Sequence, residues 1–505
     1  MLELLSSRMF EVGALTLYLT TLLWIGIRSA KQVKTSAEYT LAGRNVPWII
    51  VMATTAATMI GGGASVGMVS RVAEVGIAAA LVTCGWHLQL IFTGLFVAPR
   101  LRGLNLTTVG EYFELKFGLL ARKLAVVNCA IFLIGALAAQ MAAMGMVTNA
   151  VLGIRYDIAL LIGATITIFY STVGGIRAVV KTDVLQFTVL IVGIGAAAGI
   201  LLAKHGGFAA LATTASTGHF NMTSHWSKME FISLFVAYFL GETLVPPYTV
   251  RCFIARDSRQ AQWGVAGAGI FLMLFLPITT FVLGTSAQVS PDVQQALERE
   301  ADRIMAFSNV PEKEARKTAI QITFPTLVRT TLPPLLSGIV VAAIIAAVMS
   351  TADSCLSCLA TVVMEDIFRR HIRQDAYDHQ LLRVAQWTTL VAGIAAAICA
   401  WRFTNIADIL VFVYDFWAPA MILPFLVALF WYRSDRIYAV VASMVAGMIA
   451  TSVWRFGLQT PYDIGPALFG FAVAIIVFFI ALLFTHNWSL TRNFLPATQS
   501  LDDSQ

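Results

Sequence analysis

Long apolar runs separated by short polar connections make up most of the chain. Because a helix needs about 20 residues to cross a bilayer, this pattern predicts about thirteen membrane-spanning helices. An odd number of spans places the two termini on opposite faces of the membrane. The predicted fold class is therefore an all-α integral membrane protein. The spans cover residues 11–29, 47–70, 76–99, 124–152, 156–173, 182–203, 229–250, 262–286, 332–363, 382–401, 405–431, 437–456 and 465–486.

Two of these spans contain residues that interrupt a helix. The second span holds three successive glycines, 61–63, which favour local unwinding. The seventh holds Gly241, Pro246 and Pro247, and the prolines cannot supply helical hydrogen bonds. Gly and Pro are common in membrane helices, but the two interrupted spans also lie five apart in chain order. Interruptions at corresponding positions of two halves indicate an inverted-repeat transporter, whose freed carbonyls coordinate ions near the membrane midplane.

The ninth predicted span carries a polar face. Ala347, Ser350, Thr351 and Ser354 follow the i, i+3, i+4, i+7 spacing of one helix face, and Asp353 borders it. Small hydroxyl residues alone are typical of close helix packing and of hydrogen bonds back to the helix. A carboxylate in a span costs about 2.5–3.5 kcal/mol, which indicates a function. Hydroxyls and one carboxylate are hard oxygen ligands, suited to a small cation such as Na⁺.

Composition supports a membrane protein and argues against several other classes. Apolar residues make up 58% of the chain and charged residues 12%, against about 25% charged in soluble domains. The six cysteines lie within or at the ends of apolar segments, so neither a zinc site nor a disulfide is indicated. The net charge of +6 reflects basic loops rather than a nucleic-acid surface. No motif of a soluble enzyme domain is present, and an enzyme is not expected.

The distribution of Lys and Arg predicts the orientation. It favours an N-terminus outside and a C-terminus in the cytoplasm of the cell membrane. Arg251 is counted among the cytoplasmic loop charges, and no arginine is placed in the middle of a span. Residues 287–331 form a long extracytoplasmic loop with one mixed-charge helical run from Glu298 to Lys317. Residues 487–505 form a short cytoplasmic tail without a signalling domain.

Several short motifs resemble the sodium:solute symporter family. The resemblance covers about residues 10–430 and implies a leucine-transporter-type fold of two inverted five-helix repeats in a single polytopic domain, residues 1–486. The repeats would cover about 46–203 and 229–431, with accessory helices at about 11–29, 437–456 and 465–486. The motifs are Ala56-x-x-Met59-x-Gly61, Ala347-x-x-Ser350-Thr351, the run from Leu41 to Arg44, the run from Tyr170 to Ala178, the run from Lys181 to Gln186, and Ala418-Pro419.

The resemblance also implies ion ligands. The main sodium site of the family maps onto the carbonyls of Ala56, Met59 and Ala347 and the hydroxyls of Ser350 and Thr351, which agrees with the polar face described above. Na⁺ is the expected coupling ion, and no organic cofactor is expected. Some members have a second sodium site, although the acid expected there also fits a carboxylate that opposes a helix dipole. The second site would use Asp183, Ser350, Asp353 and Ser354.

In this fold the solute lies between the two broken helices. Glu242 and Asp415 either hold a cationic or amino-bearing solute, or are paired with a nearby cation or protonated. An anionic solute would need an arginine or a half-helix N-terminus, such as the one after Gly63. Amino acids, monocarboxylates and cationic osmolytes therefore all remain open as solutes. The candidate residues are Thr58, Gly61, Gly62, Ser65, Trp86, Gln89, Gln140, Tyr238, Glu242, Tyr248, Tyr414 and Asp415.

The function predicted from these features is sodium-coupled secondary active transport. The chain would import a small organic solute by alternating access across the lipid bilayer, as a symporter. The alternative is a transporter-like solute sensor that acts with a separate signalling partner. A channel would give no reason for the two broken helices.

Overall fold

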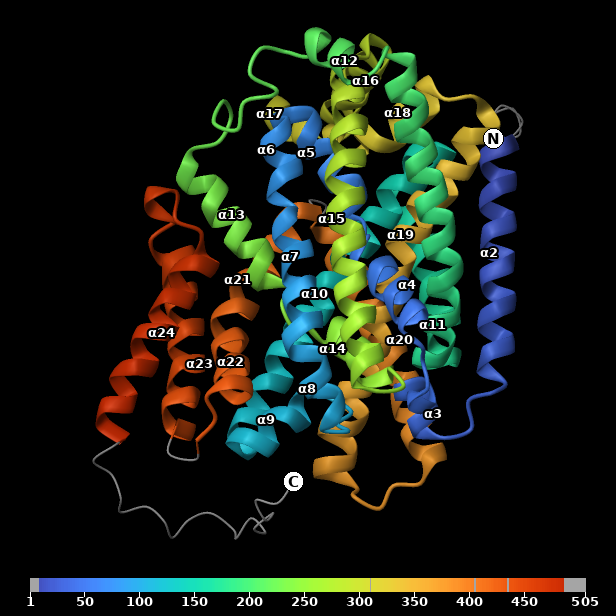
Figure 1. Cartoon of the computed structure of the whole chain (residues 1–505). Coiled ribbons are helices and arrows are strands. Elements are labelled where there is room, and N and C mark those ends of the chain that lie inside the picture. Colours follow the sequence, from blue (N-terminus) through green and yellow to red (C-terminus); the bar gives the residue numbers. More distant parts are fainter. Residues whose placement is uncertain (1–8, 309, 404–405, 434–435, 486–505) are drawn as a thin grey trace.

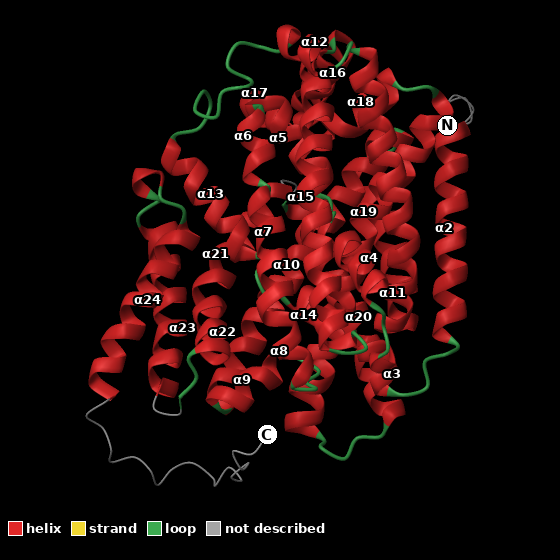
Figure 2. Ribbon diagram, viewed as in Figure 1, coloured by secondary structure: helices red, strands yellow, loops and turns green. Residues whose placement is uncertain are grey.

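The computed structural model describes residues 9–308, 310–403, 406–433 and 436–485, so the predicted tail at 487–505 lies outside the described residues. Within these ranges the chain is helical (Figure 2), and strand-like pairing is limited to an isolated bridge between Val46 and Ala255. Ten described helices are long and apolar enough to cross a membrane, or up to twelve if each of two bent pairs is one span. Tyr156–Thr172 is a shorter apolar helix.

The first half of the described chain runs from α2 to α11. The predicted spans 156–173 and 182–203 fall within one element, α11, which is kinked at Gly175, where φ is +54°. The elements are α2 (Met9–Ala30), α3 (Ser36–Leu41), η1 (Ala42–Arg44), α4 (Trp48–Met59), η2 (Gly63–Gly67), α5 (Met68–Val75), α6 (Ile77–Val82), α7 (Cys84–Phe92), η3 (Thr93–Val97), α8 (Ala98–Gly103), α9 (Val109–Phe117), α10 (Leu119–Leu152) and α11 (Tyr156–Lys204).

The second half runs from α12 to α24. The single helical run predicted from Glu298 to Lys317 is wrong, because α16 ends at Ser308 and α17 begins only after Pro311. The elements are α12 (Phe208–Thr214), α13 (Lys228–Gly241), α14 (Pro246–Ile254), α15 (Ser258–Val289), α16 (Pro291–Ser308), α17 (Glu312–Ala319), η4 (Ile320–Ile322), α18 (Thr323–Thr331), α19 (Pro334–Thr361), η5 (Val362–Ile372), α20 (Asp378–Arg402), α21 (Ile406–Trp417), η6 (Ala418–Ile422), α22 (Leu423–Phe430), α23 (Ile437–Ser452), η8 (Val453–Gly457), η9 (Pro461–Asp463) and α24 (Pro466–Thr485).

The bundle has a buried centre and peripheral helices. In the span formed by α19 and η5, 78% of an apolar stretch of 18 residues is buried inside the protein. The corresponding share is 22% in both α2 and α24. Figure 1 shows α2 at one side of the bundle and α23 with α24 at the other. Ser350, Asp353 and Ser354 are fully buried, so the polar face of α19 is enclosed by protein rather than by lipid.

The two predicted interruptions are present in the structure. The chain bends by 61° between α4 and the segment that restarts at Gly63. A Cβ atom on Gly61 would lie 2.7 Å from Thr351 Oγ1, and one on Gly62 would lie 2.4 Å from the Ala143 Cβ. Glycine is therefore needed at positions 61 and 62, because the backbone there lies too close to α19 and α10 to leave room for a side chain. The second bend, of 41°, separates α13 from α14, which opens with two prolines.

Candidate ion and solute site

The C-terminal end of α4 meets the polar face of α19. Ser350 Oγ donates hydrogen bonds to the carbonyl oxygens of Ala57, at 2.8 Å, and Ala347, at 2.9 Å. Thr351 Oγ1 donates to the Thr58 carbonyl at 2.7 Å. The two α4 carbonyls bonded in this way are neighbours of the predicted ligands in the chain. The carbonyls of the predicted ligands, at positions 56 and 59, accept from the backbone N–H groups of residues 60 and 61.

The donor set at this junction fits a small hard cation. The five predicted sodium residues offer only carbonyl and hydroxyl oxygens, which suit Na⁺ better than a soft metal ion. The C-terminal end of a helix carries unpaired carbonyls and a partial negative charge, which also favours a cation. In the described part of the chain, no group of three or more His, Cys, Asp or Glu residues is placed to hold a metal ion. The residues that would hold Na⁺ are Ala56, Met59, Ala347, Ser350 and Thr351.

A small cavity of ≈ 30 Å³ lies beside this junction, between the breaks of the two interrupted helices. Two predicted sodium residues, Met59 and Thr351, line it, so the ion site and the cavity share residues. Its walls come from α4, η2, α7, α10, α14, α19 and α21. The full lining is Thr58, Met59, Gly61, Gly63, Ala64, Trp86, Phe132, Ala136, Gln140, Glu242, Val245, Pro247, Tyr248, Thr351, Cys355, Leu410 and Tyr414.

Seven of the twelve predicted solute residues line the cavity, and five do not. Phe132, Ala136, Cys355 and Leu410 were missed, because apolar residues in an apolar span carry no distinguishing signal. Three of the five predicted residues outside the lining contact residues of the lining: the Gly62 N–H donates to Gln140 Oε1, Ser65 donates to the Gly61 carbonyl, and Tyr238 stacks on Trp86 with ring centroids 4.1 Å apart. The remaining two, Gln89 and Asp415, do not line the cavity. The predicted residues in the lining are Thr58, Gly61, Trp86, Gln140, Glu242, Tyr248 and Tyr414.

Glu242 is the carboxylate of the cavity. Its two oxygens accept hydrogen bonds from two tyrosines, Tyr248 at 2.7 Å and Tyr414. Among the described residues no Lys, Arg or His forms an ion pair with it, and the lining of the cavity includes none of these residue types. Glu242 therefore contacts neutral hydroxyls rather than a cation of the protein. The cavity presents a carboxyl group without a basic partner among the described residues.

Asp415, the other acid left open by the sequence, is in a different environment. It does not line the cavity, and it forms an ion pair with Arg455. The backbone N–H of Ala467 also donates to its Oδ1, at 3.0 Å. These contacts join α21 to η8 and α24. Of the two acids, Asp415 is therefore the one that is paired with a nearby cation.

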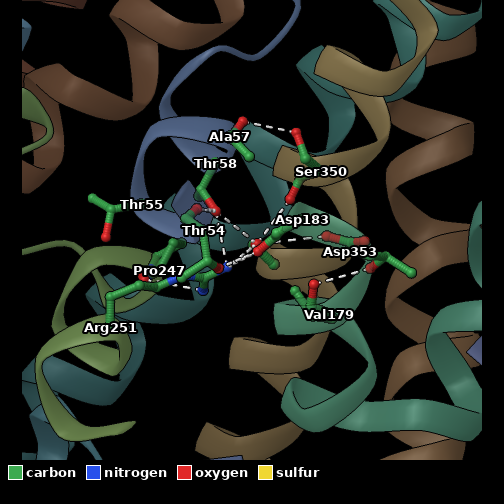
Figure 3. Close-up of polar contacts among 12 residues, drawn as sticks. Thr54, Thr55, Ala57, Thr58, Val179, Asp183, Pro247, Arg251, Ser350 and Asp353 are labelled. Atoms are coloured by element: carbon green, nitrogen blue, oxygen red, sulfur yellow. Dashed lines mark hydrogen bonds and ion pairs between the residues drawn. The ribbon is translucent and has the colours of Figure 1, made fainter. Parts of the chain in front are cut away.

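Arg251 corrects the charge assignment made from the sequence. It is a fully buried residue of α14 rather than a loop residue, and its guanidinium lies 2.9 Å from Asp183 Oδ2 (Figure 3). The apolar run ends at Val250, but α14 continues to Ile254 and remains buried. Asp183 precedes Arg251 by 68 positions. Because the compensating carboxylate is so distant in the chain, hydropathy alone could not place this arginine inside the bundle.

The residues predicted for a second sodium ion are divided among different partners. Asp183 and Ser354 contact Arg251, at 2.9 and 2.6 Å. Ser350 turns its hydroxyl towards the junction with α4. Asp353 accepts from Tyr170 at 2.6 Å. These four residues are near one another, but two of them already have a cation as a partner.

The structure defines a bundle of membrane-spanning helices in which two broken helices meet beside a buried cavity, an arrangement typical of secondary transporters. A sequence profile described as the sodium:solute symporter family matches residues 39–447. The chain belongs to the sodium:solute symporter family.

Individual relatives are transporters of different solutes, and two of the three are named as sodium-coupled. The chain is 28% identical over 460 residues to the sodium/glucose cotransporter of Vibrio parahaemolyticus, covering 87% of this chain and 83% of that protein. It is 25% identical over 489 residues to the sodium/proline symporter of Escherichia coli, covering 91% of each. It is 24% identical over 459 residues to the human high affinity choline transporter 1, covering 86% of this chain and 75% of that protein.

Two solved transporter structures have a fold similar to that of this chain. A Na⁺-coupled sialic acid symporter in a substrate-bound outward-open state matches with a TM-score of 0.79 at 21% identity, covering 94% of this chain and 97% of that one. A nucleobase-cation-symport-1 family transporter matches with a TM-score of 0.54 at 12% identity, covering 89% and 94%. Family and relatives together support a sodium-coupled symporter in a membrane, with Na⁺ as the coupling ion.

Proposed function

We propose that this protein imports a small organic solute that carries a protonated amine, coupled to sodium entry by alternating access. One observation carries the choice of solute. Glu242 places an uncompensated carboxylate in a cavity whose lining contains no basic side chain. An anionic solute would meet this charge without a counter-ion, whereas an ammonium group would form a charge-assisted hydrogen bond.

Aromatic walls support the same solute class. Trp86, Phe132, Tyr248 and Tyr414 all line the cavity, and the face of an aromatic ring attracts a cation. Trp86 Nε1 is buried, and no described residue accepts its hydrogen bond. This indole N–H is therefore a donor for an acceptor atom on the solute, such as a hydroxyl or carboxylate oxygen. The solute that fits best has an amine and a separate oxygen acceptor.

Sodium coupling would follow from residues that the two sites share. Met59 and Thr351 belong to the proposed sodium site and also line the cavity. An ion held between α4 and α19 would stabilise one arrangement of these helices, and with it one shape of the cavity. Coupling requires that sodium bind this state more tightly than the other, because equal affinity for both states would shift nothing.

The sensor alternative is not favoured, because the relatives above are transporters. For orientation we keep the proposal from the charge distribution, with the N-terminus outside and the C-terminus in the cytoplasm. The proposal for the ion site comprises the five residues named above, and the solute site comprises the lining of the cavity around Glu242.

The test is a set of solutes matched in size and different in charge. Purified protein in proteoliposomes would be offered labelled proline and prolinol, which carry an amine, and cyclopentanecarboxylate, which has a similar ring without one. Choline and its neutral isostere 3,3-dimethylbutan-1-ol form a second matched pair. We expect sodium-dependent accumulation of proline and prolinol but not of cyclopentanecarboxylate. Choline, which has a positive charge but no N–H, should accumulate less than these amines, and its neutral isostere should not accumulate. Accumulation of the carboxylate or the neutral alcohol, with no amine transported, would contradict the proposal.

A further inference from the structure

The guanidinium of Arg251 joins four helices at one point. From α14 its Nη2 donates to Asp183 of α11 at 2.9 Å, to Ser354 Oγ of α19 at 2.6 Å and to Thr58 Oγ1 of α4 at 2.8 Å. Its Nη1 donates to the Pro247 carbonyl of its own helix at 3.1 Å. Arg251 and Asp183 are both fully buried. A single protein cation therefore connects both broken helices with two core helices.

The acceptors around this cation are the oxygens that a second sodium ion would need. Asp183 and Ser354 were both expected as sodium ligands, and each already accepts from the guanidinium. Thr54 donates to the same oxygen of Asp183. Asp183 Oδ1 has no hydrogen-bond partner among the described residues, so it is the position where a further cation would have to bind. Such an ion would lie beside the guanidinium and be repelled by a like charge.

We propose that Arg251 is a resident cation that takes the place of a second sodium ion, so that this protein binds one sodium ion per transport cycle. A guanidinium stays protonated at every physiological pH, so the charge is permanent. It is also covalently attached to α14, so it is not released into the cytoplasm as a sodium ion is. The main sodium site then remains as the single exchangeable cation site.

This arrangement also links the resident cation, whose charge is matched by Asp183, to the wall of the cavity. Thr58 and Pro247, which accept from Arg251, both line the cavity. Any movement of α14 relative to α4 during transport therefore moves the guanidinium relative to Thr58, and any movement relative to α11 moves it relative to Asp183. The inference rests on the sodium site of the proposed function, which serves as the internal reference in the test below.

The test counts sodium ions on the purified full-length protein in lipid nanodiscs, with radioactive ²²Na⁺ as the probe and no solute present. We expect one sodium ion bound to the wild-type protein at saturation. Arg251→Ala leaves Asp183 and Ser354 without their cation, so we expect two. Arg251→Lys keeps a positive charge at the same place and should bind one. A purely structural role of Arg251 would change the melting temperature without changing this count.

Three further variants keep the result interpretable. Arg251→Ala with Asp183→Asn removes both charges of the pair and should return the count to one. Thr351→Ala removes an oxygen of the main site that the second site does not share, so it should weaken binding of the single sodium ion of the wild-type protein but leave one tightly bound sodium ion in the Arg251→Ala background. Two sodium ions on the wild-type protein would overturn the proposal. A count of one sodium ion on Arg251→Ala would also overturn the proposal, provided that this variant still binds sodium at the main site.

Discussion

Glu242 and Asp415 come from neighbouring helices, since α13 packs against α21, yet their carboxylates meet different groups. Glu242 accepts from two tyrosine hydroxyls inside the cavity, while Asp415 is paired with Arg455 outside it. Asp183 is paired with Arg251 deep in the bundle. A buried carboxylate needs a compensating partner, and the nature of that partner decides whether it is available to a ligand. By this criterion Glu242 is the acid that remains available.

Removing the charge of Glu242 tests its proposed role. We expect Glu242→Gln to weaken binding of an amine solute about 10-fold to 100-fold, because a hydrogen bond to a charged group contributes about 1.5–3 kcal/mol. Glu74→Gln makes the same chemical change on the exposed face of α5 and should have no effect. The measurement is competition against a transported amine from the solute set. Equal loss in both variants, or in neither, would contradict the assignment.

The sodium ligands give a second prediction at the residue scale. Ser350→Ala with Thr351→Ala removes two oxygens from the proposed shell and should raise the sodium concentration for half-maximal uptake about 100-fold, taking about 1.5 kcal/mol for each oxygen. Thr361→Ala removes another buried hydroxyl of α19, one that bonds only to its own helix, and is the matched control. Unchanged sodium dependence in the double variant would show that these hydroxyls of α19 are not sodium ligands.

The breaks in α4 and between α13 and α14 create the site at the scale of elements. Without the bend at 61–62, the Thr58 carbonyl would be used within a continuous helix, whereas in the structure it accepts from Thr351. The second break lets α14 restart with its prolines beside the cavity. Irregular backbone is tolerated at this depth because it lines a protein cavity rather than lipid.

Gly62→Ala tests the close approach that the first break needs. Its Cβ would lie 2.4 Å from the Ala143 Cβ, so α10 or the break itself must shift. Such overpacking costs about 1–3 kcal/mol, and we expect a lower melting temperature together with strongly reduced uptake. Gly199→Ala, on α11, adds the same methyl group where no atom lies within 4 Å. If both variants transport normally, the close packing at Gly62 is not required.

A charge cluster at one end of the bundle predicts a pH dependence. Glu114 of α9 accepts from Arg122 of α10 and from Arg370 of η5. Burial acts to raise the pKa of Glu114, but the hydrogen bonds from the two arginines outweigh it and lower the pKa. Its contribution to stability is therefore complete above the unfolded value of about 4.3 and is lost as pH falls through the lower folded value.

We therefore expect Glu114→Gln to melt at a lower temperature than the wild type at pH 7, with the difference shrinking as pH falls below about 4. Glu298→Gln, on the exposed surface of α16, is the control and should match the wild type throughout. A difference that stays constant between pH 7 and pH 3 would show that the charge of Glu114 does not stabilise the cluster.

At the scale of the whole molecule, the described chain begins and ends on opposite faces. Figure 1 shows the start of α2 at one edge of the bundle and the end of α24 at the other. The connection from α12 to α13 lies on the side where α2 begins, and the connection from η5 to α20 lies on the opposite side. This arrangement agrees with an odd number of crossings, while the count of thirteen stays a prediction because Tyr156–Thr172 is short.

Cysteine labelling tests both the sidedness and the orientation. In a background without the native cysteines, Ser224→Cys, between α12 and α13, should react with a membrane-impermeant maleimide added to intact cells. Gln374→Cys, between η5 and α20, should react only after the membrane is permeabilised. Both positions are exposed in the structure. The reverse pattern would mean that the positive-inside assignment is inverted, and labelling of both from outside would contradict the topology.

Local features of the chain were readable without a structure. A membrane helix satisfies its backbone hydrogen bonds within one continuous segment of the chain. Each span can therefore be predicted from a continuous apolar run in the sequence. Each predicted span overlaps a described apolar helix, and both interruptions lie where glycines and prolines mark them. The polar face of α19 was equally local, because residues 347, 350, 351 and 354 share one face of one helix. The run from Glu298 to Lys317 was predicted as one helix, although it contains Pro311, a residue type that interrupts helices.

The sequence by itself therefore determined the class of protein, the broken helices and the polar face of α19. The tertiary structure alone decided which charges are partners. Arg251 and Asp183 are 68 positions apart, and hydropathy counted the arginine as a loop charge. It likewise decided that Glu242 faces the cavity while Asp415 is paired with Arg455. The physical reason is that the cost of burying a charge depends on the groups packed around it, and those groups come from helices distant in the chain.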